Sequence, residues 1–220
     1  MLSIQQIIEA HTASVQSCTT YSLEKCCPKC HEKVEMFKRH DSRERSFRFI
    51  VGVYIYVVKS LLLRWKCPIC GKTFTDYPFF AAPHKRYVVM DMERLSAEYL
   101  EDEQQSYRKV VNPLNIPIGY HEPDDGPVEH LLAHSTPWRW IHTLGSMKNT
   151  LTESLQLVKQ KDPTSPIFRE ACPVIPDKYH SSQRKSILEN ARHLLRAGLE
   201  FHRLFGHKIF PYLETVCSRK

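Results

Sequence analysis

Two short cysteine motifs constrain the fold of this chain more than any other feature. Cys27-Pro28-Lys29-Cys30 and Cys67-Pro68-Ile69-Cys70 flank a segment dense in Val, Ile, Tyr and Phe. A Cys-x-x-Cys turn can supply two thiolates to one metal, and zinc takes four of them tetrahedrally at ~2.3 Å. The spacing therefore predicts a structural zinc site made of Cys27, Cys30, Cys67 and Cys70.

Other interpretations of these cysteines are weaker. A thioredoxin-like redox pair would need a βαβ pattern, which the sequence does not show. Buried cysteines without a metal are the second alternative. Cys26 could replace Cys27 by a slip of one residue, but only Cys27 has the two-residue spacing to Cys30. The start of the chain carries no export signal, so we expect a reducing, cytoplasmic setting in which metal binding is commoner than disulfides.

The segment between the motifs has the composition of a small antiparallel sheet. Residues 34–39, 46–58 and 61–66 are predicted strands, and the polar residues 41–45 are a predicted hairpin tip. Gly71 follows the second motif, where a left-handed conformation is often required, whereas His31 stands at the equivalent place in the first. Such a sheet has a small core, so the metal would supply much of its folding free energy.

The rest of the chain predicts helices, which makes the fold class α+β. Residues 1–24 predict a helix and a linker, 25–86 the zinc ribbon and its connector, 87–147 three helices with a Pro-rich insert, and 148–220 a C-terminal helical region. In the third helix, Thr136 is the predicted N-cap and Pro137 the first helical residue. Trp140, Ile141 and Leu144 should face the core. Three short helices ending in a polar, Arg-bearing face are typical of a helix-turn-helix.

The charge is segregated along the chain. Residues 25–86 carry 14 basic and 5 acidic side chains, a sum of +9, and residues 131–220 carry 14 and 7, a sum of +7; residues 87–130 sum to −7, with 3 and 10. Blocks of this kind predict a polyanion-binding surface. The predicted phosphate contacts are Lys38, Arg39, Arg43, Arg45, Arg48 and Lys72, and the predicted base-edge contacts are Arg139, His142 and Thr143.

The motifs also resemble a known family. Cys-Pro-x-Cys, a basic hairpin and the run from Arg64 to Thr75 resemble the zinc ribbon that opens many bacterial insertion-sequence transposases. The runs from Ser106 to Val111 and from Ser135 to Trp140 are similar to the second and third helices of their helix-turn-helix. The resemblance implies that the four cysteines bind the metal and that the third helix reads element-end DNA. His31 in place of the usual Gly, and the long excursion from Val111 to Ser135, depart from the family pattern.

The resemblance stops before catalysis. These transposases carry a downstream RNase-H-like domain whose carboxylates hold two metal ions. The residues after Met147 instead predict helices, with apolar stripes suited to a core or a dimer seam. Asp124, Asp125 and Glu129 are expected to be solvated loop carboxylates, and His130 and His134, with His121 or Asp124, are a weak candidate for a second metal. We therefore expect no enzyme activity.

The sequence thus predicts a non-catalytic, zinc-dependent DNA-binding protein. It would be derived from or accessory to a mobile element, act in end recognition or transcriptional regulation, and associate with the nucleoid. Its expected partners are double-stranded DNA, a transposase or other mobile-element protein, and a second copy through the C-terminal helices, with no membrane. Two alternatives stay open: an RNA-binding ribbon stacking bases on Phe47, Phe49, Tyr54 and Tyr56, and a protein-interaction adaptor on a zinc scaffold.

Overall fold

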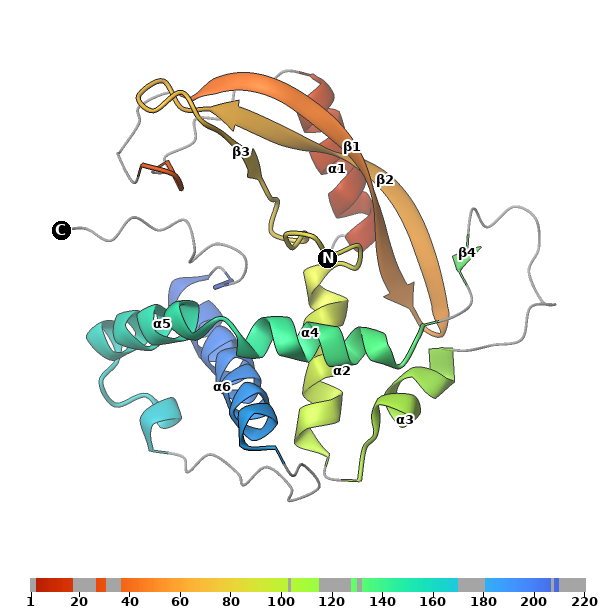
Figure 1. Ribbon diagram of the computed structural model, residues 1–220, viewed down its shortest axis with the longest axis vertical. Helices are drawn as coiled ribbons and strands as arrows, with labels where there is room; N and C mark the ends of the chain where they lie inside the picture. Colours follow the sequence, from red (N-terminus) through yellow and green to blue (C-terminus); the bar gives the residue numbers. More distant parts are fainter. Residues whose placement is uncertain are drawn as a thin grey trace.

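A long β-hairpin arches over a group of helices (Figure 1). The computed structural model describes residues 3–17, 27–30, 37–102, 104–114, 128–129, 132–169, 181–206 and 208–209. The strands are β1 (Lys38–Val51), β2 (Tyr54–Lys66), β3 (Thr73–Asp76) and β4 (Val128–Glu129). The helices are α1 (Ile4–Gln16), α2 (Val89–Glu101), α3 (Tyr107–Val111), α4 (Ser135–Gly145), α5 (Lys148–Lys161) and α6 (Ser182–Phe205), with 3₁₀ turns η1 (Asn112–Leu114) and η2 (Pro166–Phe168). The α+β class is confirmed.

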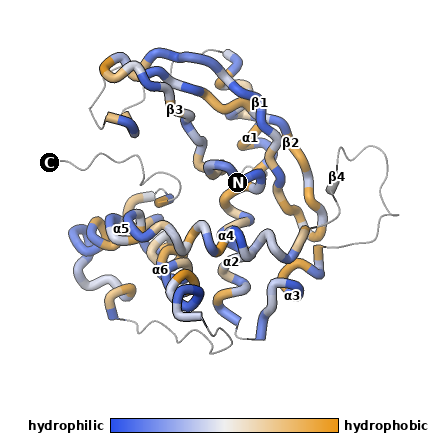
Figure 2. Tube along the Cα trace, in the orientation of Figure 1, coloured by the Kyte–Doolittle hydropathy of each residue, from blue (hydrophilic) through white to orange (hydrophobic). Residues whose placement is uncertain are grey.

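The hairpin turns at Gly52 and Val53, not at residues 41–45 as predicted. β1 and β2 pair antiparallel from Val51 and Tyr54 back to Lys38 and Lys66. Gly52 has φ +60, as the first residue of a two-residue hairpin turn often requires. Residues 41–45 belong to β1, and all five pair directly with residues 60–64 of β2. The prediction was wrong because polar residues on an exposed strand look like a loop, which Figure 2 shows as the hydrophilic first half of β1.

β2 is the strand on which the sheet is built. It pairs with β1 along its whole length, with β3 near its end and with β4 near its start. A β-bulge between Arg39 and Asp41 interrupts the register of the hairpin. Bulges bend and twist a strand, which fits the curvature of the arch in Figure 1.

Helix α1 covers one face of the hairpin. Ile8 packs with Phe47, Phe49, Leu62 and Phe80 in a buried cluster. His11 lies beside this cluster, and its Nε2 donates to the Leu61 carbonyl at 3.0 Å. Burial lowers the pKa of His11, although this hydrogen bond opposes the shift. The capping box of Ser3 and Gln6 starts the helix.

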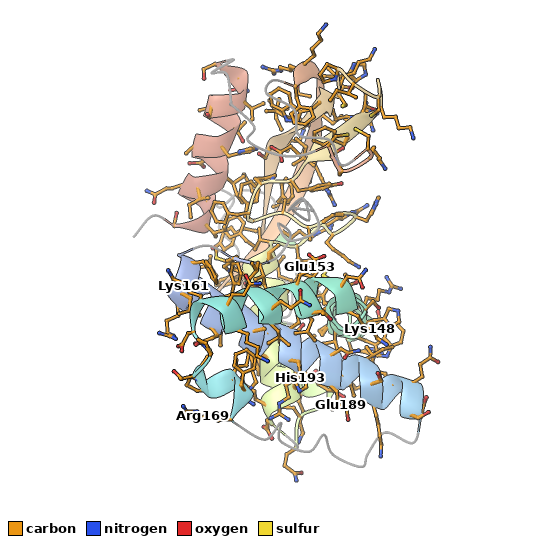
Figure 3. The ribbon with its side chains drawn as sticks, turned by 90° about the vertical axis from the view of Figure 1, so that its left-hand side faces the viewer. Lys148, Glu153, Lys161, Arg169, Glu189 and His193 are labelled. Atoms are coloured by element: carbon orange, nitrogen blue, oxygen red, sulfur yellow. The ribbon has the colours of Figure 1, made fainter. Side chains whose placement is uncertain are left out.

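The main core lies among α2, α4, α5 and α6. The predicted inward residues of α4 are confirmed, since Trp140, Ile141 and Leu144 are at most 2% exposed. The predicted cap of α4 is wrong, because the helix begins at Ser135 with His134 before it and no side-chain cap. In Figure 3, Lys148 and Lys161 mark the two ends of α5, which lies against α6, the helix that carries Glu189 and His193. None of the helices in the described ranges is long and apolar enough to cross a bilayer.

The turn end of the hairpin is fastened to the helices by a buried carboxylate. Asp91 Oδ2 of α2 accepts a hydrogen bond from the Ile50 amide at 2.8 Å, and only 7% of Asp91 is exposed. Burial raises the pKa of this carboxyl, while the Ile50 N–H and Arg94 oppose the shift. The connector before α2, residues 77–88, adds two more hydrogen bonds, from the Arg48 amide to the Arg86 carbonyl and from the Val88 amide to the Arg48 carbonyl. The Asp91 carboxylate and two backbone hydrogen bonds therefore hold the hairpin at this end.

Helices α4 and α6 lie in close backbone contact at Gly145. A Cβ atom on Gly145 would lie 2.1 Å from the Ile187 carbonyl oxygen. Relieving that overlap would require the backbones of the two helices to move apart, because the contacted atom is not in a flexible side chain. Gly198, within α6, has open surroundings by comparison, since a Cβ there would meet only Ile209 side-chain carbons at 3.6 Å.

The two glycines give a matched test of the helix packing. Gly145→Ala should lower the free energy of unfolding by about 1–3 kcal/mol, the usual range for overpacking a core. Gly198→Ala should be neutral or raise it by up to about 1 kcal/mol, because Ala is the better helix former. Urea unfolding monitored by circular dichroism measures both. Equal effects of the two substitutions would contradict the packing described here.

Candidate functional site

Four cysteine sulfurs converge at the end of the sheet opposite the hairpin turn. The Sγ atoms of Cys27, Cys30, Cys67 and Cys70 all lie within 4.8 Å of one another. We call this group the four-cysteine cluster. Cys27 and Cys67 are buried, and Cys30 and Cys70 are half-buried. The first pair comes from the turn at residues 27–30, and the second directly follows β2.

The sulfur positions fit one tetrahedral metal ion. Four sulfurs at ~2.3 Å from a central ion lie about 3.8 Å from each other. The Cys27 and Cys70 sulfurs are 3.8 Å apart, and the Cys30 and Cys67 sulfurs are 3.9 Å apart. A disulfide would need an S–S distance of about 2.05 Å, so these pairs are not disulfides and their spacing suits a metal. The four-cysteine cluster is thus positioned to hold a metal ion.

Backbone geometry shapes the second cysteine turn. The Gly71 amide donates to the Cys67 carbonyl at 3.0 Å, and the Cys67 amide donates to the Lys72 carbonyl at 2.9 Å. Gly71 has φ +69, so its predicted left-handed conformation is confirmed. His31 and Cys26, which mattered to the first turn in the sequence, lie outside the described residues.

The environment of Cys67 favours the thiolate that a metal needs. Burial raises the pKa of the Cys67 thiol, but the amides of Cys70 and Ile69 and the thiols of Cys27 and Cys70 lower it more. The pKa falls to about 7 as a result. A bound cation would favour the thiolate further.

Exposed cations lie near the cysteines along the chain and in the sheet. Lys38 of β1 is directly opposite Lys66 of β2, and both side chains are exposed. Lys66 precedes Cys67 in the chain, and Lys72 is the residue whose carbonyl accepts from the Cys67 amide. We call the following set the cationic end of the sheet. Its members are Lys29, Lys38, Arg39, Lys66 and Lys72, all exposed.

Lys29 and Lys66 were not among the predicted contacts. The signal that could have found Lys66 is the register of the hairpin, which places its side chain on the same face as that of Lys38. Like charges directly opposite each other in a sheet are destabilising. Such a pair is therefore suited to an anionic partner that neutralises both.

Of the other phosphate contacts predicted on the hairpin, one is exposed and two are half-buried in contacts within the protein. Arg43 is exposed on β1. Arg45 is half-buried, donates to the Lys85 carbonyl and lies 5.5 Å from the Phe47 ring centroid. Arg48 is half-buried and lies 5.8 Å from the Tyr87 ring centroid. The last two arginines therefore help to attach the connector to β1.

The predicted base-reading residues share one surface of α4. Arg139 and His142 are exposed and Thr143 is half-buried. The Thr143 hydroxyl donates to the Arg139 carbonyl at 2.8 Å, and the His142 ring stacks on Trp138. Burial lowers the pKa of Lys85, and the nearby Arg139 charge lowers it further. This surface of α4 thus has a cationic neighbour in the connector.

The aromatic residues proposed for base stacking do not form one exposed surface. Phe47 and Phe49 are at most 3% exposed and belong to the cluster under α1. Tyr54 and Tyr56 are half-buried, and Tyr56 stacks on Phe49 at 5.5 Å. Stacking of unpaired bases on the two phenylalanines is therefore excluded in this fold.

The weaker candidate sites lie largely outside the described residues. His121, Asp124, Asp125 and His130 are not described, nor is the side chain of Glu129. His134 is exposed at the start of α4. Within the described ranges, the four-cysteine cluster is the group of His, Cys, Asp and Glu side chains arranged to hold a metal.

Part of the chain is similar to a known family of protein domains. Residues 27–110 are similar to a family described as a domain of unknown function, DUF6431. The matched stretch is less than half of the chain and contains the four-cysteine cluster, the hairpin, the connector and α2. Neither the curated proteins nor the solved structures gave a match.

Replacing one of the four cysteines tests the metal site directly. The purified chain should hold one metal ion, and Cys67→Ser should lower the metal content well below one ion per chain, because only three of the four thiolates remain to bind it. We expect a loss of more than about 3 kcal/mol in unfolding free energy, below the ~10 kcal/mol found for fully zinc-dependent peptides. Elemental analysis and urea unfolding measure the two effects.

Cys172→Ser provides the matched control, because Cys172 stands outside the two Cys-x-x-Cys motifs. It should leave metal content and stability unchanged. Full metal content in Cys67→Ser would show that the four sulfurs do not act together.

Proposed function

We propose that this chain is a non-catalytic DNA-binding protein stabilised by zinc, and that it derives from or assists a mobile element. The observation that carries the proposal is the cationic end of the sheet, where Lys38 and Lys66 face each other beside the four-cysteine cluster. A phosphate backbone would neutralise that like-charge pair, and phosphate contacts supply most non-specific affinity for DNA.

Zinc is the metal that best suits the four-cysteine cluster. Closed sets of four cysteines are typical of structural zinc, and catalytic zinc sites leave one position open for water or substrate. Four thiolates fill all four positions. We therefore assign the ion a structural role, which is to hold the turn at residues 27–30 against the end of β2.

The helices supply the second half of the proposed DNA-binding surface. α2, α3 and α4 share one apolar core that includes Leu95, Val110 and Ile141. Burial of Trp140 and Ile141 leaves Arg139 and His142 of α4 exposed. An Arg that pairs with guanine contributes roughly 1–3 kcal/mol of discrimination. This arrangement supports a helix-turn-helix role in which α4 reads bases.

The likeness of the cysteine motifs and basic hairpin to transposase zinc ribbons supports the mobile-element origin. The proposed roles are recognition of element ends or transcriptional regulation. A transposase is the expected protein partner, and association with the nucleoid follows from DNA binding. Competition between single-stranded RNA and duplex DNA separates this proposal from an RNA-binding role, and pull-down from nuclease-treated lysate separates it from an adaptor role.

The salt dependence of DNA binding tests the cationic end of the sheet. Replacing Lys38 and Lys66 together by Gln removes two proposed phosphate contacts. The slope of log affinity against log salt should become shallower by about 1.8, since each neutralised phosphate contributes ~0.9. Fluorescence anisotropy with a random-sequence duplex measures the slope.

Lys159→Gln with Lys161→Gln is the matched control, because it removes the same charge from exposed positions at the end of α5. Its slope should equal that of the unmodified chain. If both double variants change the slope equally, net charge rather than the cationic end controls binding.

Arg139→Ala tests base reading by α4. After unbiased selection of a preferred duplex, this variant should lose about 10-fold in affinity for that duplex and much less for random sequence. Arg108→Ala, at an exposed position of α3, should affect both duplexes alike. An equal loss on both duplexes in Arg139→Ala would remove α4 from base readout.

A further inference from the structure

The connector is fixed between β1 and α4. On one side, Arg45 of β1 donates a hydrogen bond to the Lys85 carbonyl. On the other side, the Tyr87 ring packs edge-on against the Trp140 ring of α4, with 5.0 Å between the ring centroids. Arg139 directly precedes Trp140 on α4. The ring contact therefore brings Lys85, two residues before Tyr87, close to Arg139.

A tight turn sets the backbone position of Lys85. Its amide donates to the Ala82 carbonyl at 3.2 Å, and His84, the third residue of this turn, has φ +59. Pro83 stands second. Proline at the second position and a positive φ at the third are typical of a type II β-turn. The turn and the Arg45 contact together hold the backbone of Lys85 in place.

Lys85 and Arg139 bring two positive charges together without an anion between them. Lys85 is half-buried and Arg139 is exposed. Among the described residues, neither side chain forms an ion pair or a hydrogen bond. Burial lowers the pKa of Lys85 and the Arg139 charge lowers it further, so the amine faces another cation. A nearby like charge disfavours the charged form of an amine, and a bound anion would relieve that repulsion.

We propose that Lys85 contacts a backbone phosphate of duplex DNA and so seats α4 in the groove, where Arg139 reaches the base edges. The inference rests on the proposed DNA-binding function, and it adds a contact outside the cationic end of the sheet. Duplex DNA carries one phosphate per roughly 3.4 Å on each strand. Phosphate contacts fix the orientation of a protein on the duplex, and base contacts specify sequence. Lys85 thus positions what Arg139 reads.

Chemical footprinting of the full-length chain tests the contact without any substitution. An acetylating reagent modifies lysine amines that are open to solvent, and mass spectrometry measures the extent at each lysine. Lys85 should react in the free chain and lose most of its reactivity when a random-sequence duplex is bound. Lys161, exposed at the end of α5, is the internal control and should react equally in both states.

Three variants measure what the contact contributes. Lys85→Gln should make the slope of log affinity against log salt shallower by about 0.9 and weaken binding roughly 8-fold at 0.1 M salt, by the same factor on every duplex. Lys85→Arg keeps the charge and should keep the slope. Lys161→Gln removes the same charge elsewhere and should change neither quantity. Circular dichroism confirms that each variant is folded.

Three results would overturn the inference while leaving the proposed function in place. They are a Lys85 amine that reacts equally with and without duplex, one that is already unreactive in the free chain, and a Lys85→Gln slope equal to that of the unmodified chain or of Lys161→Gln. A chain that binds no duplex at all would overturn both the inference and the proposed function, so the two failures are distinguishable.

Discussion

The end of the sheet opposite the hairpin turn depends on one constraint, the convergence of four cysteine sulfurs. The cluster that packs there is small, with Val15, Phe37, Leu63 and Trp65 as its buried side chains beside the cysteines. A core of that size gives limited hydrophobic stabilisation. One ion bound to both cysteine pairs would join the turn at residues 27–30 to the end of β2 and add coordinate bonds where apolar area is scarce.

Different interactions hold the two ends of the hairpin, and the charged side chains at the two ends differ in how they are used. At the turn end, Asp91, Arg45 and the Arg48 backbone are used in contacts with the helices and the connector. At the metal end, Lys38 and Lys66 are exposed directly opposite each other. At the metal end, cationic side chains of both strands thus lie exposed beside each other, and the proposed polyanion would neutralise them.

The sequence predicted those parts of the site that depend on local spacing. Two Cys-x-x-Cys turns specify their ligands within four residues, and the helical period of α4 placed Trp140, Ile141 and Leu144 in the core. The hairpin turn was missed because Gly52 and Val53 interrupt an apolar run only briefly. The structural roles of Arg45 and Arg48 depend on Lys85 and Tyr87, which local patterns cannot bring together. Leu199 fits the apolar stripe of α6 but is 75% exposed. The helical period shows which residues share a face, and it does not show how much of that face another element covers.

X-ray absorption at the metal edge tests the central claim most directly, because it measures the ligands of the ion itself. The account predicts zinc with four sulfur neighbours at about 2.3 Å. A shell containing nitrogen or oxygen, or fewer than four sulfurs, would contradict it, since one of the two cysteine pairs would then not be bound as described.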